Sequence, residues 1–155
     1  MSLVEPAGVD VADVDIDLPV EAYLPEEYVP DLRHKIDLYR RIAKINDAGE
    51  IRETRDELRD RFGPLPSAAG RMLELAELRL DAAAWQVSAV TSDARFIILH
   101  YGNRRQIEQL AKTSRVPIRI VDRRRAYIPT TDFDMIAYPA GSCWLQLARA
   151  ALHLG

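Results

Sequence analysis

The chain has 155 residues, 48% of them hydrophobic and 29% charged, which is the composition of one ordinary globular domain. Its formal net charge of −3 argues against a protein that holds nucleic acid through its overall charge, although a local basic patch stays open. The single cysteine excludes an internal disulfide and fits a reducing compartment. No apolar run is long enough to span a bilayer, so we expect no membrane partner.

The first residues of the chain are small, acidic and without periodicity. We expect a linker or leader at residues 1–13 and the domain proper at residues 14–155. The opening stretch also lacks the basic start and the apolar run of a signal peptide. The length of 155 residues predicts one domain, and the opening Met1-Ser2-Leu3 leaves open that this domain was cut from a longer protein.

A short strand and an irregular connector come next. Residues 15–20 alternate polar and apolar side chains, which predicts a strand that Pro19 confines to an edge or an end of a sheet. Residues 23–31 contain two prolines and have few regular hydrogen bonds to offer. We therefore expect Tyr23 and Tyr28 to hold this connector against other elements.

Three helices are predicted between residues 31 and 86. The first covers residues 31–46 with Asp31 as its N-cap, the second residues 50–62, and the third residues 66–86 with Trp85 at its end. The apolar stripes expected on the first and third helices are Ile36, Tyr39, Ile42, Ala43 and Ile45, and Met72, Leu75, Ala76, Leu80 and Ala83.

The second half of the chain changes character. It reads as strands at 87–90, 96–100, 117–121 and 126–128, with helices at 103–113 and 142–154. Together these elements predict an α+β domain, in which a helix-rich N-terminal half packs on a small sheet built from strand-helix-strand elements.

The second helix separates its apolar and charged side chains. Ile51, Leu58 and Phe62 share one face. Glu57, Asp60 and Arg61 are neighbours on the other face, because they are three and four residues apart. Gly63 then offers a left-handed residue and Pro64 prevents continuation, so the helix ends abruptly.

Two interpretations of this charged face stay open. In the first it is a solvated surface held by an ion pair between Glu57 and Arg61, worth about 0.2–0.5 kcal/mol. In the second it is a partner surface whose carboxylates meet arginines of another protein module.

Arginines gather in the second half, and they also admit two interpretations. Arg104 and Arg105 begin a helix, where backbone N–H groups and guanidinium groups could hold a phosphate. Arg123, Arg124 and Arg125 occupy a turn, and only Tyr101 and Tyr127 accompany the arginines as aromatics. We therefore favour ordinary surface charge over a nucleic-acid contact for this set, which also includes Arg115 and Arg119.

Known catalytic patterns are absent from the sequence. It contains no phosphate-binding loop, no GxGxxG and no GxSxG, and the three histidines are far apart. One cysteine cannot build a zinc site, and paired carboxylates such as Asp56 and Asp60 are typical of a solvated helix. We expect no catalytic residue, no cofactor and no metal in this chain.

Three sequence segments resemble a known family. They are VDIDLPVEAYLPEEYVPD, KIDLYRRIAKI and DELRDRFGPLP, and they are similar to the C-terminal domain of the bacterial transcription-repair coupling factors, the Mfd family. The resemblance is strong from about Asp13 to Leu80, weaker to about Pro129, and not detectable from Thr131 onward.

The resemblance implies a function for the whole parent protein. Members of the family are ATP-driven DNA translocases that remove stalled RNA polymerase and recruit excision-repair proteins in the bacterial cytoplasm. Their motor and ATP site lie outside the C-terminal domain.

For the domain itself, the resemblance implies autoinhibition without catalysis. It packs on an N-terminal module similar to part of UvrB and masks the surface that binds UvrA. Family contacts correspond to Glu57, Asp60 and Arg61 here. The alternative is an accessory domain that binds nucleic acid through its arginines.

Overall fold

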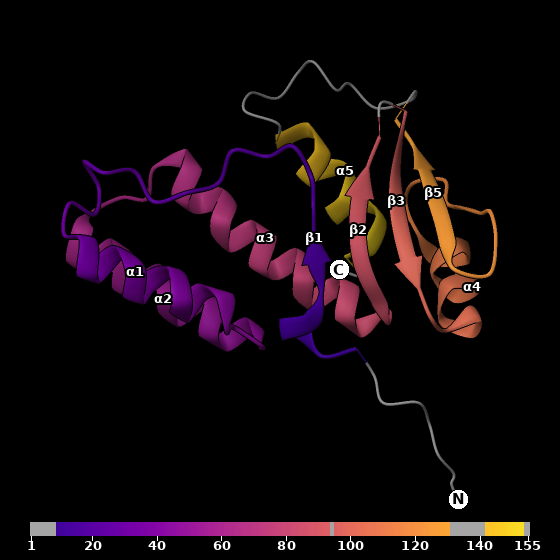
Figure 1. Cartoon of the computed structure of the whole chain (residues 1–155), viewed down its shortest axis with the longest axis horizontal. Helices are drawn as coiled ribbons and strands as arrows, with labels where there is room; N and C mark the ends of the chain where they lie inside the picture. Colours follow the sequence, from indigo (N-terminus) through magenta and orange to yellow (C-terminus); the bar gives the residue numbers. More distant parts are fainter. Residues whose placement is uncertain (1–8, 94, 131–141, 154–155) are drawn as a thin grey trace, which may run out of the picture.

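The structure is a computed structural model that describes residues 9–93, 95–130 and 142–153 (Figure 1). Its helices are a short 3-10 helix at Val11–Asp13, then α1 Leu32–Ala43, α2 Ala48–Phe62, α3 Ser67–Ala84, α4 Arg104–Thr113 and α5 Ser142–Leu152. Its strands are β1 Asp15–Ile16, β2 Val87–Ser92, β3 Phe96–Tyr101, β4 Arg119–Ile120 and β5 Arg125–Pro129. The predicted α+β class is confirmed.

The five strands form one sheet in the order β1-β2-β3-β5-β4. β1 pairs in parallel with β2, and the other pairs are antiparallel. β1 lies at the sheet edge as expected, but it is shorter than the predicted strand over residues 15–20 and ends before Pro19, which cannot donate to a ladder.

One face of the sheet carries the larger of two hydrophobic cores. Along β3, Ile97 and Leu99 are fully buried, whereas Phe96 and Ile98 are only partly covered. The buried residues pack on side chains of α3, α4 and α5, all of which lie on the same side of the sheet (Figure 1). Side chains alternate between the two faces along each strand, so Phe96 and Ile98 point to the opposite face. In the part of the chain described, no helix covers that face.

The smaller core lies between α1, α2, the first half of α3 and the connector before α1. It includes Leu38 and Ile42 of α1 with Ile51 and Leu58 of α2. This core fixes the position of α2, the element with the predicted charged face.

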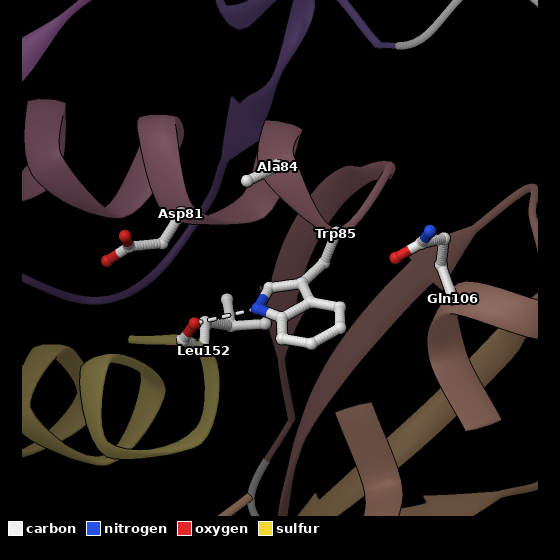
Figure 2. Close-up of a pocket in the computed structure, with 5 residues that line it drawn as sticks. All are labelled: Asp81, Ala84, Trp85, Gln106 and Leu152. Carbon is white, nitrogen blue, oxygen red and sulfur yellow. Dashed lines mark hydrogen bonds between the residues drawn. The ribbon is translucent and has the colours of Figure 1, made fainter. Parts of the chain in front are cut away.

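The C-terminal helix packs on α3, as its helical spacing of apolar residues indicated. The Trp85 indole Nε1–H at the end of α3 donates to the carbonyl of Leu152 at 2.9 Å (Figure 2). Arg149 of α5 pairs with Glu77 of α3 at 2.6 Å. A hydrogen bond and an ion pair together join two helices that are far apart in the sequence.

Some expectations about side chains were wrong. Ile36 is 41% exposed and Leu38 takes its place in the core, because α1 presents its Leu38–Ile42 row to its neighbours. Tyr23 is 49% exposed, so Tyr28 is the aromatic residue that holds the connector. On α3, Leu73 and Leu78 are buried more deeply than Met72 and Leu75 of the predicted stripe.

The domain boundary at residue 14 stays a prediction. Val9 is half-buried against the larger core, and the 3-10 helix at Val11–Asp13 contacts α3. Residues 1–8 and 131–141, which belong to the predicted leader and tail, lie outside the described residues.

Candidate protein-interaction site

The second helix has well-defined ends. The Asp47 side chain accepts from the backbone N–H of Glu50 at 2.8 Å and caps the N-terminus. At the other end the N–H of Gly63 donates to the carbonyl of Arg59 at 3.0 Å. The helix therefore begins and ends at defined residues, which limits fraying of its two ends.

Gly63 stops the helix with a backbone conformation that favours glycine. Its φ is 90° and its ψ is −170°. The positive φ confirms the expectation from the sequence, whereas the ψ is extended and not that of a left-handed helical residue. The following Pro64 accounts for this difference, because proline disfavours helical ψ values in the residue before it.

Tyr28 of the connector contacts this helix end through its hydroxyl and its ring. Its hydroxyl lies 2.8 Å from the carbonyl oxygen of Gly63 and 3.1 Å from that of Leu58. Its ring packs on Phe62 with 5.7 Å between centroids. The connector thus supplies a hydrogen-bond donor to backbone carbonyls at this helix end. Burial raises the pKa of Tyr28, so its hydroxyl stays protonated as a donor at neutral pH.

Four charged residues lie together at the surface beside this helix end: Arg41 of α1 and Glu57, Asp60 and Arg61 of α2. We call this set the charged ridge. Glu57 Oε2 lies 2.6 Å from Arg41 Nη1 of α1 and 3.3 Å from Arg61 Nη1. The Arg61 guanidinium also lies over the Phe62 ring, 5.1 Å from its centroid. Asp60 is exposed and forms no salt bridge within the described residues.

The electrostatics of the ridge follow from this geometry. The hydrogen bond from Arg41 lowers the pKa of Glu57, against a smaller opposing effect of desolvation, and Arg61 lowers it further. Glu57 is therefore a bridged carboxylate, while Asp60 remains an exposed negative charge beside it. Such a surface can recognise charges of both signs at fixed positions.

The sequence brought three of the four ridge residues together, and the structure keeps them together at the surface. Arg41 was missed, because it lies sixteen residues before Glu57 on another helix. The available signal was the double arginine Arg40-Arg41 in the last turn of α1, but spacing within one helix cannot reveal a contact between two helices.

The predicted basic residues divide into two groups. Arg104 and Arg105 are exposed on α4, where Arg104 pairs with Glu108 at 2.7 Å. Arg123 and Arg124 lie in the turn before β5, and Arg125 begins that strand and pairs with Asp122 at 2.8 Å. Tyr101 is only 5% exposed, so it is wrong as a stacking residue for nucleic acid.

A hollow of about 280 Å³ beside Trp85 is lined by two polar side chains, Asp81 and Gln106. Asp81 lines it, and burial raises the pKa of Asp81, against the hydrogen bond from His153. The Asp81 carboxylate and the Gln106 amide lie on opposite sides of the Trp85 indole (Figure 2). A reaction centre needs polar groups that converge on one point, and these two do not.

The described part of the chain contains neither a metal-ligand cluster nor a membrane-spanning helix. In residues 9–93, 95–130 and 142–153, no group of three or more His, Cys, Asp or Glu side chains is arranged to hold a metal ion. None of the helices described there combines the length and the apolar character needed to cross a membrane.

The chain is similar in sequence to known repair factors. A family model of the TRCF domain matches residues 18–111. The transcription-repair-coupling factor of Staphylococcus aureus (strain USA300) is 31% identical over 91 residues, and that of Mycobacterium bovis (strain ATCC BAA-935 / AF2122/97) is 41% identical over 80 residues. These matches cover 59% and 52% of this chain but only 8% and 6% of the relatives.

The fold is also similar to that of a solved structure, described as the crystal structure of the C-terminal domain of transcription-repair coupling factor. The TM-score is 0.71, and the match covers 90% of this chain and 92% of the other at 20% sequence identity. The sequence resemblance, the fold and a family match over more than half of the chain agree: the chain belongs to the TRCF domain family.

Proposed function

We propose that this chain is the regulatory C-terminal domain of a bacterial transcription-repair coupling factor, and that it covers a surface of its own parent polypeptide. Family membership and the likeness to a C-terminal domain support this proposal. The chain itself performs no chemistry and uses no cofactor. The ATP-driven DNA translocase and the contact with RNA polymerase belong to other parts of the parent, which acts in the cytoplasm.

The observation that carries the proposal is the charged ridge at a stiff helix end. Asp60 and Arg61 are exposed, and Gly63 and Tyr28 fix the backbone beside them. The proposed partner is the UvrB-like N-terminal module of the parent, whose UvrA-binding surface the domain masks. An arginine of that module would meet Asp60, and a carboxylate would meet Arg61.

A weak contact suffices for such a role. Two modules of one polypeptide meet at an effective concentration of about millimolar, so modest affinity keeps the surface covered. The cover opens when another event favours the open state by a few kcal/mol. Exposed ion pairs, each worth about 1 kcal/mol or less, suit a contact that must be reversible.

The test is charge reversal in the full-length parent protein. We expect Glu57→Lys with Asp60→Lys to raise the affinity for UvrA several-fold, because both lysines would repel the arginines of the masking partner. Surface plasmon resonance with immobilised UvrA measures the change. Thermal unfolding of the variant checks that the extra positive charge beside Arg41 and Arg61 leaves the domain folded.

A matched control reverses two carboxylates elsewhere. Asp15 and Asp17 are exposed at the sheet edge, and Asp15→Lys with Asp17→Lys changes the net charge by the same amount. We expect this control to bind UvrA as the wild type does. Equal affinity of the ridge variant and the wild type would reject the ridge as the masking surface.

A further inference from the structure

The sheet face opposite the helices carries aromatic and basic side chains. The residues that share it are known from the strand register: Ile98 of β3 faces Tyr127 of β5, and Tyr127 faces Arg119 of β4. We call this surface the open sheet face; its members are Phe96, Ile98, His100, Arg119, Arg125, Tyr127 and Pro129. All are partly or fully exposed, and the helices α4 and α5 lie behind the sheet (Figure 1).

One end of the open sheet face is aromatic. The Phe96 and Tyr127 rings lie 5.0 Å apart between centroids with an interplanar angle of 49°. They line a hollow of about 340 Å³ together with Arg119 and Val121. Val121 is 49% exposed, so the hollow combines aromatic and aliphatic side chains with the Arg119 cation.

The other end is basic. His100 and the arginines of the turn, Arg123 to Arg125, line a hollow of about 500 Å³ with Asp122. The Asp122 carboxylate is already engaged: it accepts from Arg125 side-chain nitrogens and from the backbone N–H groups of Arg124 and Arg125. Within the described residues, the side chains of Arg123 and Arg124 form no salt bridge.

The two hollows lie along one line. Phe96 and His100 are both on the open side of β3 and four residues apart, which places them about 13 Å from each other along the strand. A ligand that spans both ends therefore needs flat apolar groups at one end and negative charge at the other.

We propose that the open sheet face binds single-stranded nucleic acid. Bases stack on Phe96 and Tyr127, Arg119 meets the adjoining phosphate, and Arg123 and Arg124 meet phosphates at the basic end. Stacking on aromatic side chains beside a positively charged track is how single strands are held without sequence readout. An acidic peptide would satisfy the arginines, but it would leave the paired rings without a flat partner.

This site keeps Arg119, the arginines of residues 123–125 and Tyr127 from the arginine surface expected from the sequence, but it excludes the residues expected at the start of α4. Arg104 and Arg105 lie on α4 on the helical side of the sheet, and Tyr101 is buried there. Phe96 replaces Tyr101 as the companion of Tyr127. The proposal also leaves the charged ridge untouched, so each can fail without the other.

The experiment is a titration of the purified chain against fluorescent twelve-nucleotide probes, oligo-dT and oligo-rU, by fluorescence anisotropy at several salt concentrations. We expect saturable binding that weakens as salt rises, with a log–log slope of about −0.7 for each phosphate neutralised. Binding of either probe supports the proposal, and the preferred sugar identifies the strand. A duplex of the same length should bind several-fold more weakly.

Variants separate stacking from charge. Phe96→Leu with Tyr127→Leu keeps apolar side chains and should weaken binding at least five-fold while leaving the salt slope unchanged. Arg123→Gln with Arg124→Gln should reduce the slope by about 1.4. Arg104→Gln with Arg105→Gln removes the same charge from α4 and is the matched control, with affinity expected to equal that of the wild type.

Several outcomes would overturn the proposal. They are no binding at low salt, full affinity in the leucine variant, equal loss in the α4 control, or equally tight binding of a polyglutamate peptide. If the leucine variant does not fold, backbone amide shifts of the wild-type chain decide. Probe-induced shifts in β3 and β5 support the site, and shifts confined to other elements reject it.

Discussion

At the scale of single residues, the conformation of Gly63 is the feature that shapes the candidate site. A positive φ with an extended ψ is a region that residues with a Cβ avoid. The chain leaves α2 in that conformation and enters Pro64, so the helix cannot gain another turn. The charged residues before it are therefore held at a fixed distance from the end of the helix.

Replacing Gly63 should test this directly. We expect Gly63→Ala to lower the free energy of unfolding by about 1–3 kcal/mol, because a Cβ disfavours this backbone conformation even though the space around it is open. Gly70→Ala is the matched control: Gly70 lies within α3 with open space around it, and alanine there should stabilise by about 0.5–1 kcal/mol. Urea unfolding measures both, and equal effects would contradict the argument.

Glu57 should make stability depend on pH. Its pKa is lowered in the folded state, chiefly by Arg41, so its contribution is present above the unfolded pKa of about 4.3 and is lost as pH falls through the folded pKa. Because the Glu57 side chain is 34% exposed, solvent screening keeps this contribution below about 1 kcal/mol. The destabilisation caused by Glu57→Gln should therefore be larger at neutral pH than in acid.

Urea titrations at neutral pH and below the unfolded pKa measure that difference. Asp56→Asn serves as the comparison, since Asp56 is exposed on the same helix and has no salt bridge in the described part of the chain. A penalty for Glu57→Gln that is the same at both pH values would show that the ion pairs with Arg41 and Arg61 do not contribute.

At the scale of elements, the sequence predicted helices best where capping and periodicity agree. Asn103 accepts from the N–H of Gln106, and α4 covers Arg104–Thr113 as expected. In α1 the N-cap Asp31 was also confirmed, and Ile42 of the predicted row is buried, but the row through Leu38 is covered where the row through Ile36 was expected. Both rows are apolar at helical spacing, and only the position of neighbouring helices decides which one is covered.

For the candidate site too, contacts within one helix were predictable from the sequence and contacts between elements were not. Neighbours within α2 follow from helical geometry, so Glu57, Asp60 and Arg61 could be grouped from the sequence. The contact of Arg41 with Glu57 and the support from Tyr28 depend on how α1 and the connector pack on α2. Neither relation has a periodic signal in the chain.

At the scale of the whole molecule, the last helix completes the sheet core. α5 contributes fully or almost fully buried side chains to that core: Leu145, Leu147, Ala148, Ala151 and Leu152. Yet the family match ends at residue 111 and the sequence resemblance fades before Thr131. The α5 segment thus fills part of the core although it lies outside the family match. The residues that it packs against could not be identified from the sequence.

A chain that ends at residue 130 should consequently lose cooperative unfolding. Without α5, the apolar surface of α3 and the inner sheet face is exposed, and Trp85 loses the acceptor at Leu152. Near-ultraviolet circular dichroism and thermal scans of the truncated chain measure the loss. His153→Ala in the complete chain removes only the exposed contact with Asp81 and should retain a sharp transition. A cooperative transition in the truncated chain would contradict the role assigned to α5.

Sheet order was the least predictable property of the fold. The strands lie within or close to the predicted ranges, although β1 and β4 are shorter than expected, but the pairing of β1 with β2 and that of β3 with β5 join segments far apart in the sequence. Strand pairing over such distances is specified by the whole core and not by any one segment.

Helix α3 belongs to both cores, with Leu73 and Ala76 in the smaller and Leu78 and Ala82 in the larger. Its 18 residues form a rod of about 27 Å. Because this continuous helix packs in both cores, a force applied at the end of α2 is transmitted through α3 to the sheet. Under the proposed function, the domain would leave its partner surface as one rigid body, and a nucleic acid bound to the open sheet face would move with it.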